Sequence, residues 1–349
     1  MLEKLADSAE ITFQKSSDHW SELREVCENS GGISSFIDLG RSEEGRKICG
    51  ARLGRGEKQV SLIGGSHSDE PAGPETLRVF ITEIAKYGTD YSSLLNRFTF
   101  FVFPQVNPDG EAKNQSWLKP EPHPGKYLSS AFREPPGRDL EFGYPDLRRE
   151  NRLLSDFWRK TGPFSLHISF HGMGFSEGVL FLIERHWISR TVELRAAVLR
   201  IAEKYDLPLH DHNRKGEKGF YYIGPGFSTT PEASMMRMHF ESQGDAKTAA
   251  LFKLSSMEFI QSLGGDPVCC VTELPLFLLS SPQKEHKPGT PDLYNRFQEE
   301  KEQITLELSR DTDNTGPSWE YKDMTIIPLG MRKAVQIQLE ILESALKGI

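Results

Sequence analysis

The chain has 349 residues, 37% of them hydrophobic and 26% charged, which is enough for one large α/β domain with additions or for two domains. Its net charge is −8 and no run of basic residues stands out, so nothing indicates a nucleic-acid-binding surface. The sequence has no secretory signal pattern and no apolar run near the roughly 20 residues of a membrane span, and its four cysteines fit reduced residues; we expect a cytoplasmic protein that binds no membrane.

Apolar residues recur along the chain with the periods of strands and helices in alternation. This order favours an α/β fold with a mostly parallel, mixed β-sheet covered by helices on both faces. Residues 111–146 have no clear period and predict an ordered loop along a cleft, and the Gly- and Pro-rich residues 206–245 predict an insertion beside the active site. We expect strands at 60–63, 97–103, 166–171, 179–184 and 268–273, and helices within 1–30 and at 74–87, 150–158, 191–205, 246–263, 295–308 and 329–346.

The most informative segment is Gly64-Gly65-Ser66-His67-Ser68-Asp69-Glu70, which directly follows a predicted strand. An imidazole and a carboxylate three residues apart can close on one metal ion, and a catalytic zinc keeps one further position for water. Glu70 is favoured over Asp69 because its longer side chain reaches back to the same ion. The pair is weak evidence on its own, since His-x-x-Glu occurs often by chance.

Two further predicted strands end in side chains that suit the same site. His171 closes one of them and Glu273 closes the other, and ligands bind outside the carboxyl ends of strands in open parallel sheets. His167 faces the same side of its strand as His171, so alternation cannot separate the two; the strand-end position favours His171. Apolar flanks predict partial burial of Glu273, and burial raises the pKa of a carboxyl, which suits a group that takes and returns a proton.

Two other motifs complete a pattern. They are Gly40-Arg41-Ser42-Glu43-Glu44-Gly45-Arg46 and Pro104-Gln105-Val106-Asn107-Pro108-Asp109-Gly110. With them, the chain from about Leu39 to Phe277 resembles the zinc carboxypeptidases of the carboxypeptidase A superfamily as a divergent member. The resemblance implies one zinc ion (Zn2+) per chain, held by His67, Glu70 and His171, with Glu273 as general base and acid. We accordingly predict a zinc carboxypeptidase-like catalytic domain at 39–281, an N-terminal helical segment at 1–38, and a C-terminal helical extension at 282–349 packed on the domain.

The chain departs from the family in two places. The family has an Asn-Arg pair that helps to hold the substrate's terminal carboxylate, and here Glu141 and Phe142 stand in the corresponding stretch. The arginine that usually polarises the scissile carbonyl also has no clear match. Lys119, Arg133 or Arg138 could serve instead, and we expect Arg138 first, then Arg133, to bind substrate.

The resemblance predicts an enzyme that cleaves an amide bond with zinc-activated water and a glutamate base. The default prediction is a metallocarboxypeptidase that removes a C-terminal residue from a peptide. Loss of the Asn-Arg pair keeps open a zinc-dependent deacylase or amidase acting on acyl amino acids. A zinc-free binding protein on the same scaffold is a third alternative, which the intact set of four site residues argues against.

Overall fold

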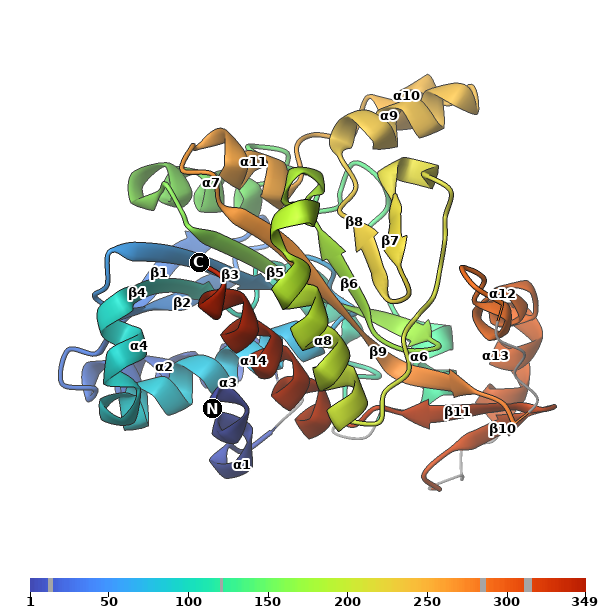
Figure 1. Ribbon diagram of the computed structural model, residues 1–349, viewed down its shortest axis with the longest axis horizontal. Coiled ribbons are helices and arrows are strands. Elements are labelled where there is room, and N and C mark those ends of the chain that lie inside the picture. Colours follow the sequence, from blue (N-terminus) through green and yellow to red (C-terminus); the bar gives the residue numbers. More distant parts are fainter. Residues whose placement is uncertain (12–14, 120–121, 283–286, 311–315) are drawn as a thin grey trace.

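The computed structural model describes residues 1–11, 15–119, 122–282, 287–310 and 316–349. Its strands are β1 (Ser34–Arg41), β2 (Lys47–Gly54), β3 (Lys58–Gly64), β4 (Phe98–Phe103), β5 (Leu166–Ser176), β6 (Leu180–Ile183), β7 (Tyr222–Gly224), β8 (Phe227–Thr229), β9 (Val268–Ser280), β10 (Trp319–Tyr321) and β11 (Met324–Pro328). They form one eleven-stranded sheet in the order β1-β2-β4-β3-β5-β9-β6-β8-β7, with β11 also paired to β9 and β10 to β11 (Figure 1).

The sheet is mixed, with a parallel centre. β4, β3, β5 and β9 run parallel to one another, whereas β2 is antiparallel to β4 on one side and β6 is antiparallel to β9 on the other. Apart from the 3-10 turns, the helices are α1 (Leu5–Ser8), α2 (Ser16–Glu28), α3 (Ala72–Tyr87), α4 (Ser92–Arg97), α5 (Pro108–Asn114), α6 (Pro124–Ser130), α7 (Arg149–Thr161), α8 (Val192–Lys204), α9 (Ala233–Ser242), α10 (Ala246–Ala249), α11 (Ser256–Ser262), α12 (Asp292–Glu299), α13 (Lys301–Arg310) and α14 (Met331–Lys347).

Helices cover both faces of this sheet, so the predicted α/β class is confirmed. Side chains of α3 and α14 share one buried core with the strands, and α7 and α11 share a second core with the opposite face. Figure 1 shows α14 and α8 side by side in front of the sheet. Among the described residues, no helix has both the length and the apolar character that a bilayer crossing requires.

The alternation of side chains along β9 and β5 decides which face carries the predicted site. Cys270 joins the core under α3 and α14, whereas Cys269 and Val271 join the core under α7 and α11. Because successive side chains of a strand point to opposite faces, Glu273 shares the face of Val271. His171 of β5 lies directly opposite Glu273 in the parallel register.

His171 and Glu273 were expected to close their strands, and this expectation is wrong. β5 and β9 stay paired well beyond them, through Ser176 and Leu278. The glycines after His171 do not end the strand but allow close packing: a Cβ at Gly174 would lie 2.4 Å from the hydroxyl oxygen of Tyr127. Both side chains are therefore held inside a continuous strand pair.

Two helical expectations also differ from the structure. The single helix expected at 246–263 is two helices, because Ser255 caps the start of α11 with a capping box. Its hydroxyl accepts from the Glu258 N–H, and the Glu258 carboxylate accepts from the Ser255 N–H. The helix expected at 295–308 is α12 followed by α13. The side chain of Asn107 accepts a hydrogen bond from Gly110 N and caps α5.

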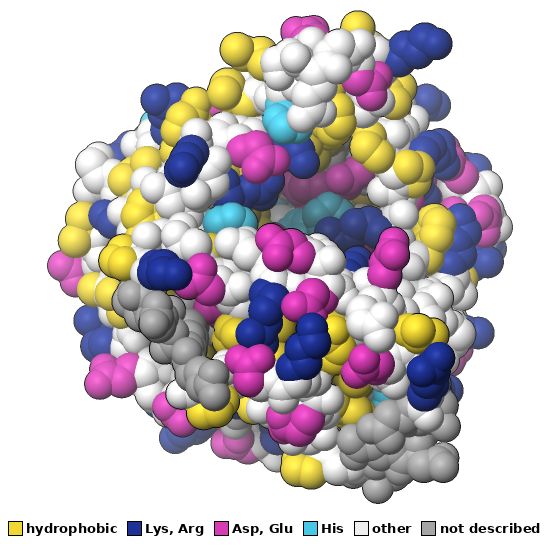
Figure 2. Space-filling view, turned by 90° about the vertical axis from the view of Figure 1, so that its right-hand side faces the viewer, with side chains coloured by type: hydrophobic (Ala, Val, Ile, Leu, Met, Phe, Trp, Pro, Cys, Tyr) yellow, Lys and Arg dark blue, Asp and Glu magenta, His cyan; other side chains and the backbone are white. Residues whose placement is uncertain are grey.

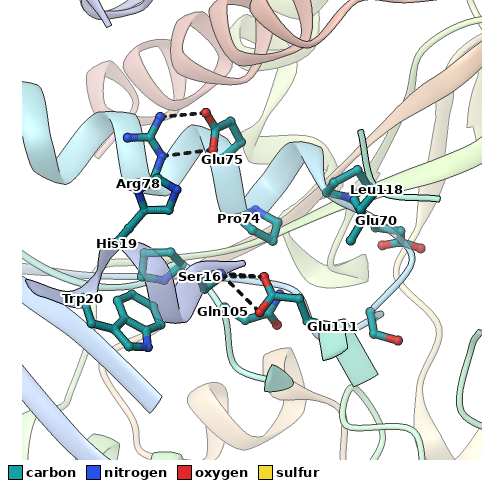
Figure 3. Close-up of a pocket in the computed structure, with 13 residues that line it drawn as sticks. Ser16, His19, Trp20, Glu70, Pro74, Glu75, Arg78, Gln105, Glu111 and Leu118 are labelled. Atoms are coloured by element: carbon teal, nitrogen blue, oxygen red, sulfur yellow. Dashed lines mark hydrogen bonds and ion pairs between the residues drawn. The ribbon is translucent and has the colours of Figure 1, made fainter. Parts of the chain in front are cut away.

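Helix α2 packs on α3 and β1, and its residues Ser16, His19 and Trp20 line a small pocket. Figure 3 shows this pocket, which has a volume of about 40 Å3. Ser16 donates from its N–H and its hydroxyl to Glu111, with distances of 3.1 and 2.6 Å to Oε1, while Arg78 of α3 pairs with Glu75. Glu70 lies in the wall of the same pocket, so the N-terminal segment reaches the neighbourhood of the predicted metal site.

The C-terminal segment 282–349 is not helical throughout. It also contributes β10 and β11, which extend the main sheet beyond β9. Its last helix, α14, packs on α3 and α8. Residues 283–286 and 311–315 of this segment lie outside the described residues, and the domain boundaries at 38 and 281 stay predictions.

Candidate metal centre

The first two candidate ligands stand in a tight turn after β3. Gly65 begins this turn with a φ of +75°, and a Cβ there would lie 2.1 Å from Oε1 of Gln105, so only glycine fits. The turn closes with a hydrogen bond of 3.3 Å from Glu70 N to His67 O. It brings His67 Nδ1 to 3.0 Å from Glu70 Oε1.

His171 completes the cluster from β5. Its Nδ1 lies 2.9 Å from Glu70 Oε2 and 3.0 Å from His67 Nδ1. Two ring nitrogens in such contact need a proton or a cation between them. Zinc–nitrogen bonds of about 2.0–2.1 Å in a tetrahedral site would place ligand atoms roughly 3.3 Å apart, close to what is seen. Two imidazoles and a carboxylate are also the kind of donor set that catalytic zinc sites use, so these residues fit a zinc ion.

Within the parts of the chain that are described, this is the group of His, Cys, Asp or Glu residues close enough to share a metal ion. His167, the alternative to His171, lies elsewhere. Its Nδ1 is 3.0 Å from Ser61 Oγ and its Nε2 is 3.1 Å from Ser256 Oγ. Burial lowers the pKa of His167 to about 4. His167 is therefore a neutral, hydrogen-bonded core residue and not a ligand of the cluster.

Each candidate histidine ligand has a carboxylate at its other ring nitrogen. Asp139 Oδ2 lies 3.4 Å from His67 Nε2, and Glu141 Oε2 lies 3.3 Å from His171 Nε2. Burial raises the pKa of Asp139, but the charge of His67 and its hydrogen bond outweigh burial and the pKa is lowered. Carboxylates in this position fix the ring orientation and the tautomer of a metal-binding histidine. Neither residue was predicted from the sequence as a partner of the ligands, although Glu141 had marked this stretch as unlike the family.

Glu273 stands beside the cluster without entering it. Its Oε2 is buried and has no hydrogen-bond partner among the described residues. Burial, followed by the nearby charge of Glu70, raises the pKa of Glu273 to about 8. A carboxyl of this kind is poised to exchange a proton near neutral pH.

Of the three cations considered from the sequence, the structure brings Arg133 to the cluster. Its Nε donates to Asp69 Oδ1 at 2.8 Å, and its Nη2 pairs with Glu70. The hydroxyl of Tyr127 donates to Asp69 Oδ2 at 3.0 Å and completes this arrangement. Arg138 instead pairs with Glu43, away from the histidines, and Lys119 is exposed.

The surroundings offer room for a substrate. Figure 2 shows a hollow on the face at the right of Figure 1, in which histidine, acidic and basic side chains gather. A separate cavity of about 730 Å3 has Glu70 in its wall, but Leu274 and Met331, which also line it, belong to the core under α3 and α14, on the other face of the sheet from Glu273. The histidines His210 and His212 are not part of the cluster: His210 is buried, and the two rings contact the ring of Tyr294 with centroids 5.1 and 5.9 Å away.

A family model described as zinc carboxypeptidase matches residues 20–184, which include His67, Glu70 and His171. Residues 20–184 of the chain are therefore similar to the zinc carboxypeptidase family. The match stops before Glu273, whose place beside the cluster comes from the β5–β9 pairing.

Curated relatives match only part of their own length. Carboxypeptidase B of Astacus astacus is 29% identical over 140 residues, which are 38% of this chain and 46% of that protein. Zinc carboxypeptidase A 1 of Anopheles gambiae is 29% identical over 137 residues, covering 37% of this chain and 31% of the relative. The matches therefore span less than half of these relatives.

Solved structures show the same fold across nearly the whole chain. Bovine thrombin-activatable fibrinolysis inhibitor, solved with tick carboxypeptidase inhibitor, has a TM-score of 0.54 at 14% identity and covers 97% of this chain and 99% of its own. A metallo-carboxypeptidase from Burkholderia cenocepacia has a TM-score of 0.51 at 15% identity, with 95% of this chain and 67% of that chain covered. At these identities the likeness concerns the fold alone.

Proposed function

We propose that the chain is a zinc-dependent hydrolase that cleaves an amide bond, and that it acts as a metallocarboxypeptidase on peptides. The observation that carries the proposal is the pairing of the ligand cluster with the carboxyl of half-buried Glu273, whose buried Oε2 has no partner among the described residues. His67 Nδ1, Glu70 and His171 Nδ1 converge on one point, and Glu273 lies directly opposite His171 on the same face of the sheet. Burying these ionisable groups costs free energy, which a bound metal ion and a catalytic proton acceptor would account for.

The chain's own residues suggest how the reaction would run. A zinc ion held by His67, Glu70 and His171 would supply Lewis acidity and lower the pKa of water. Glu273 Oε2, which has no other partner, would accept the proton of the attacking water. Because its pKa is raised, Glu273 would hold that proton and return it to the nitrogen of the departing amine.

Arg133 is the cation best placed to help. Its guanidinium reaches the cluster, yet 45% of its side chain is exposed, so it can also meet a substrate. It could stabilise the oxyanion that forms at the carbonyl, or hold a substrate carboxylate. We assign it the first role, because it contacts Glu70 of the ligand set itself. Arg138, the first expectation from the sequence, would need to leave Glu43 to act here.

A second candidate function is a zinc-dependent deacylase or amidase for acyl amino acids. One observation favours it: the positions that resemble the family's Asn-Arg pair are occupied by side chains that are already engaged. Glu141 is bound to Ser256 and lies against His171, and Phe142 packs against Phe252 with ring centroids 5.6 Å apart. Neither side chain can give a charged hydrogen bond to a terminal carboxylate.

Hydrolysis of three substrate sets separates the candidates. Zinc-loaded protein is assayed with peptides that have a free C-terminus, with the same peptides as C-terminal amides, and with N-acyl amino acids. The proposal expects release of the C-terminal residue from free peptides, abolished in Glu273→Gln. Cleavage of acyl amino acids or amides alone moves the second function ahead, and zinc binding without any hydrolysis identifies a binding protein.

A further inference from the structure

Glu141 is a fully buried carboxylate whose two oxygens face different groups. Oε1 accepts from the backbone N–H of Ser256 at 3.2 Å and from its hydroxyl at 2.5 Å. Only 5% of the residue is exposed. The N–H donor at Oε1 is part of the backbone and cannot reverse its direction, so this side of residue 141 must be an acceptor.

The other oxygen faces the candidate ligand His171. Oε2 lies 3.3 Å from Ser169 Oγ and 3.3 Å from His171 Nε2, while Ser169 Oγ and His171 Nε2 are 2.8 Å apart. An ionised carboxylate can only accept, so the proton of the Ser169 hydroxyl points to Glu141. The hydroxyl oxygen must then accept from His171, which places the histidine proton on Nε2 and leaves the Nδ1 lone pair open.

A single short segment serves both histidines in this way. Asp139 faces Nε2 of His67, and two residues later Glu141 faces Nε2 of His171. The Glu141 N–H donates to Asp139 Oδ1 at 2.8 Å, which ties the two carboxylates together. Both candidate rings thus turn Nδ1 toward the shared point, 3.0 Å from each other.

We propose that Glu141 is a positioning residue for the metal: acting on His171 both directly and through the Ser169 hydroxyl, it selects the tautomer that binds the ion. Glu141 stands where the family resemblance predicts a substrate-binding amide. In this chain it would instead hold a metal ligand in position. The inference rests on the proposed metal site, but not on the identity of the substrate or on turnover.

The substitution Glu141→Gln tests the direction of the hydrogen bonds. Its carbonyl oxygen must replace Oε1 to accept from Ser256 N, so its NH2 group faces Ser169 and His171. That arrangement lets Ser169 donate to Nε2 and favours the tautomer with its proton on Nδ1, which competes with the metal. Loss of such an outer partner typically weakens metal binding about 10–100-fold, and we expect a loss in that range.

Zinc affinity is measured on metal-free protein at neutral pH by competition with a chelator, and the cobalt-loaded forms are compared by their visible absorption. Glu258→Gln is the matched control: Glu258 is bound at the same end of α11, to Ser255 N and Ala233 N, and touches neither histidine. We expect Glu258→Gln to keep the zinc affinity and the cobalt spectrum, and Glu141→Gln to change both. Ser169→Ala, which leaves only the direct 3.3 Å contact, should lose less affinity than Glu141→Gln.

Unchanged zinc affinity in folded Glu141→Gln overturns the inference while leaving the proposed function intact, provided that the wild type binds zinc and hydrolyses substrate. An equal loss in Glu258→Gln also overturns it, because the effect would then come from α11 and not from the histidine. If Glu141→Gln does not fold without metal, Ser169→Ala decides alone: undiminished zinc affinity with an unchanged cobalt spectrum refutes the relay. A wild type that binds no zinc refutes the proposed function instead.

Discussion

Replacing Glu273 by glutamine should abolish hydrolysis, keep the metal and stabilise the metal-free protein at high pH. The substitution preserves the size of a side chain whose Oε2 has no partner among the described residues, so it removes a titrating proton and little packing. A general base contributes typically about 10²–10⁴-fold to a rate, and hydrolysis should fall by that factor. Zinc should remain, because none of the hydrogen bonds within the ligand cluster involves Glu273.

The effect on stability follows from the pKa of Glu273, which burial raises from 4.5 to about 8. The folded protein holds this proton where the unfolded chain has released it, so the wild type is most stable, in this respect, below pH 4.5. As the pH rises from 4.5 to 8 the unfolded state is increasingly favoured, by about 1.4 kcal/mol per unit, or up to about 5 kcal/mol in all. Glutamine does not titrate and is spared this loss.

The assay is urea unfolding of metal-free wild type and Glu273→Gln at pH 5 and pH 8, with zinc content and hydrolysis measured on the loaded proteins. The stability difference in favour of the variant should grow by several kcal/mol between the two pH values. An identical pH dependence would refute the claim that Glu273 is an unpaired buried acid. Full hydrolysis in the variant would remove its role as base, and loss of zinc would make it a ligand.

Three further predictions concern the ring and guanidinium groups. His171→Ala should lose most of the zinc, whereas His167→Ala should keep it; the opposite pattern would exchange the two assignments. Burial holds the pKa of His167 near 4, against 6.5 for a free histidine, so its contribution to stability is complete above pH 6.5 and is lost as the pH falls toward 4. In urea unfolding, wild type should therefore lose up to about 3 kcal/mol more free energy of unfolding than His167→Gln between pH 7 and pH 4. Arg133→Ala should lower kcat for free peptides and for their C-terminal amides alike; a rise in KM confined to free peptides would show instead that Arg133 holds the terminal carboxylate.

The sequence predicts the central strands of the sheet but not β1 and β2 at one side of it. The strands that pair at the centre are buried on both faces and read as apolar runs, such as Val60-Ser61-Leu62-Ile63 in β3. β1 and β2 carry glycines and charges and were not expected as strands. The close approach of β4 requires glycine at position 50 of β2, since a Cβ there would lie 2.1 Å from Val102 O. Its low strand propensity is thus a consequence of tertiary packing, which no local pattern reveals.

The residues of the site are likewise predictable from the sequence only in part. His67 and Glu70 share one turn, and His171 and Glu273 stand on strands that the sequence shows, so these four residues can be proposed from motifs. The partners of the cluster, Arg133 among them, come from residues 111–146, which have no periodicity. That segment contains the end of α5 and all of α6, and its course over the site depends on long-range contacts such as the hydrogen bond between Tyr127 and Asp69. Choosing among the candidate arginines therefore requires the fold.

The central claim is that His67, Glu70 and His171 hold one catalytic zinc ion. Its most direct test is to titrate zinc into the metal-free protein while recording both bound metal and peptide hydrolysis. Hydrolysis should rise in proportion to bound zinc and reach its plateau at about one equivalent per chain, and His67→Ala should show neither signal in the same range. Hydrolysis that proceeds undiminished in the metal-free protein, or a folded wild type that takes up no zinc, would contradict the claim.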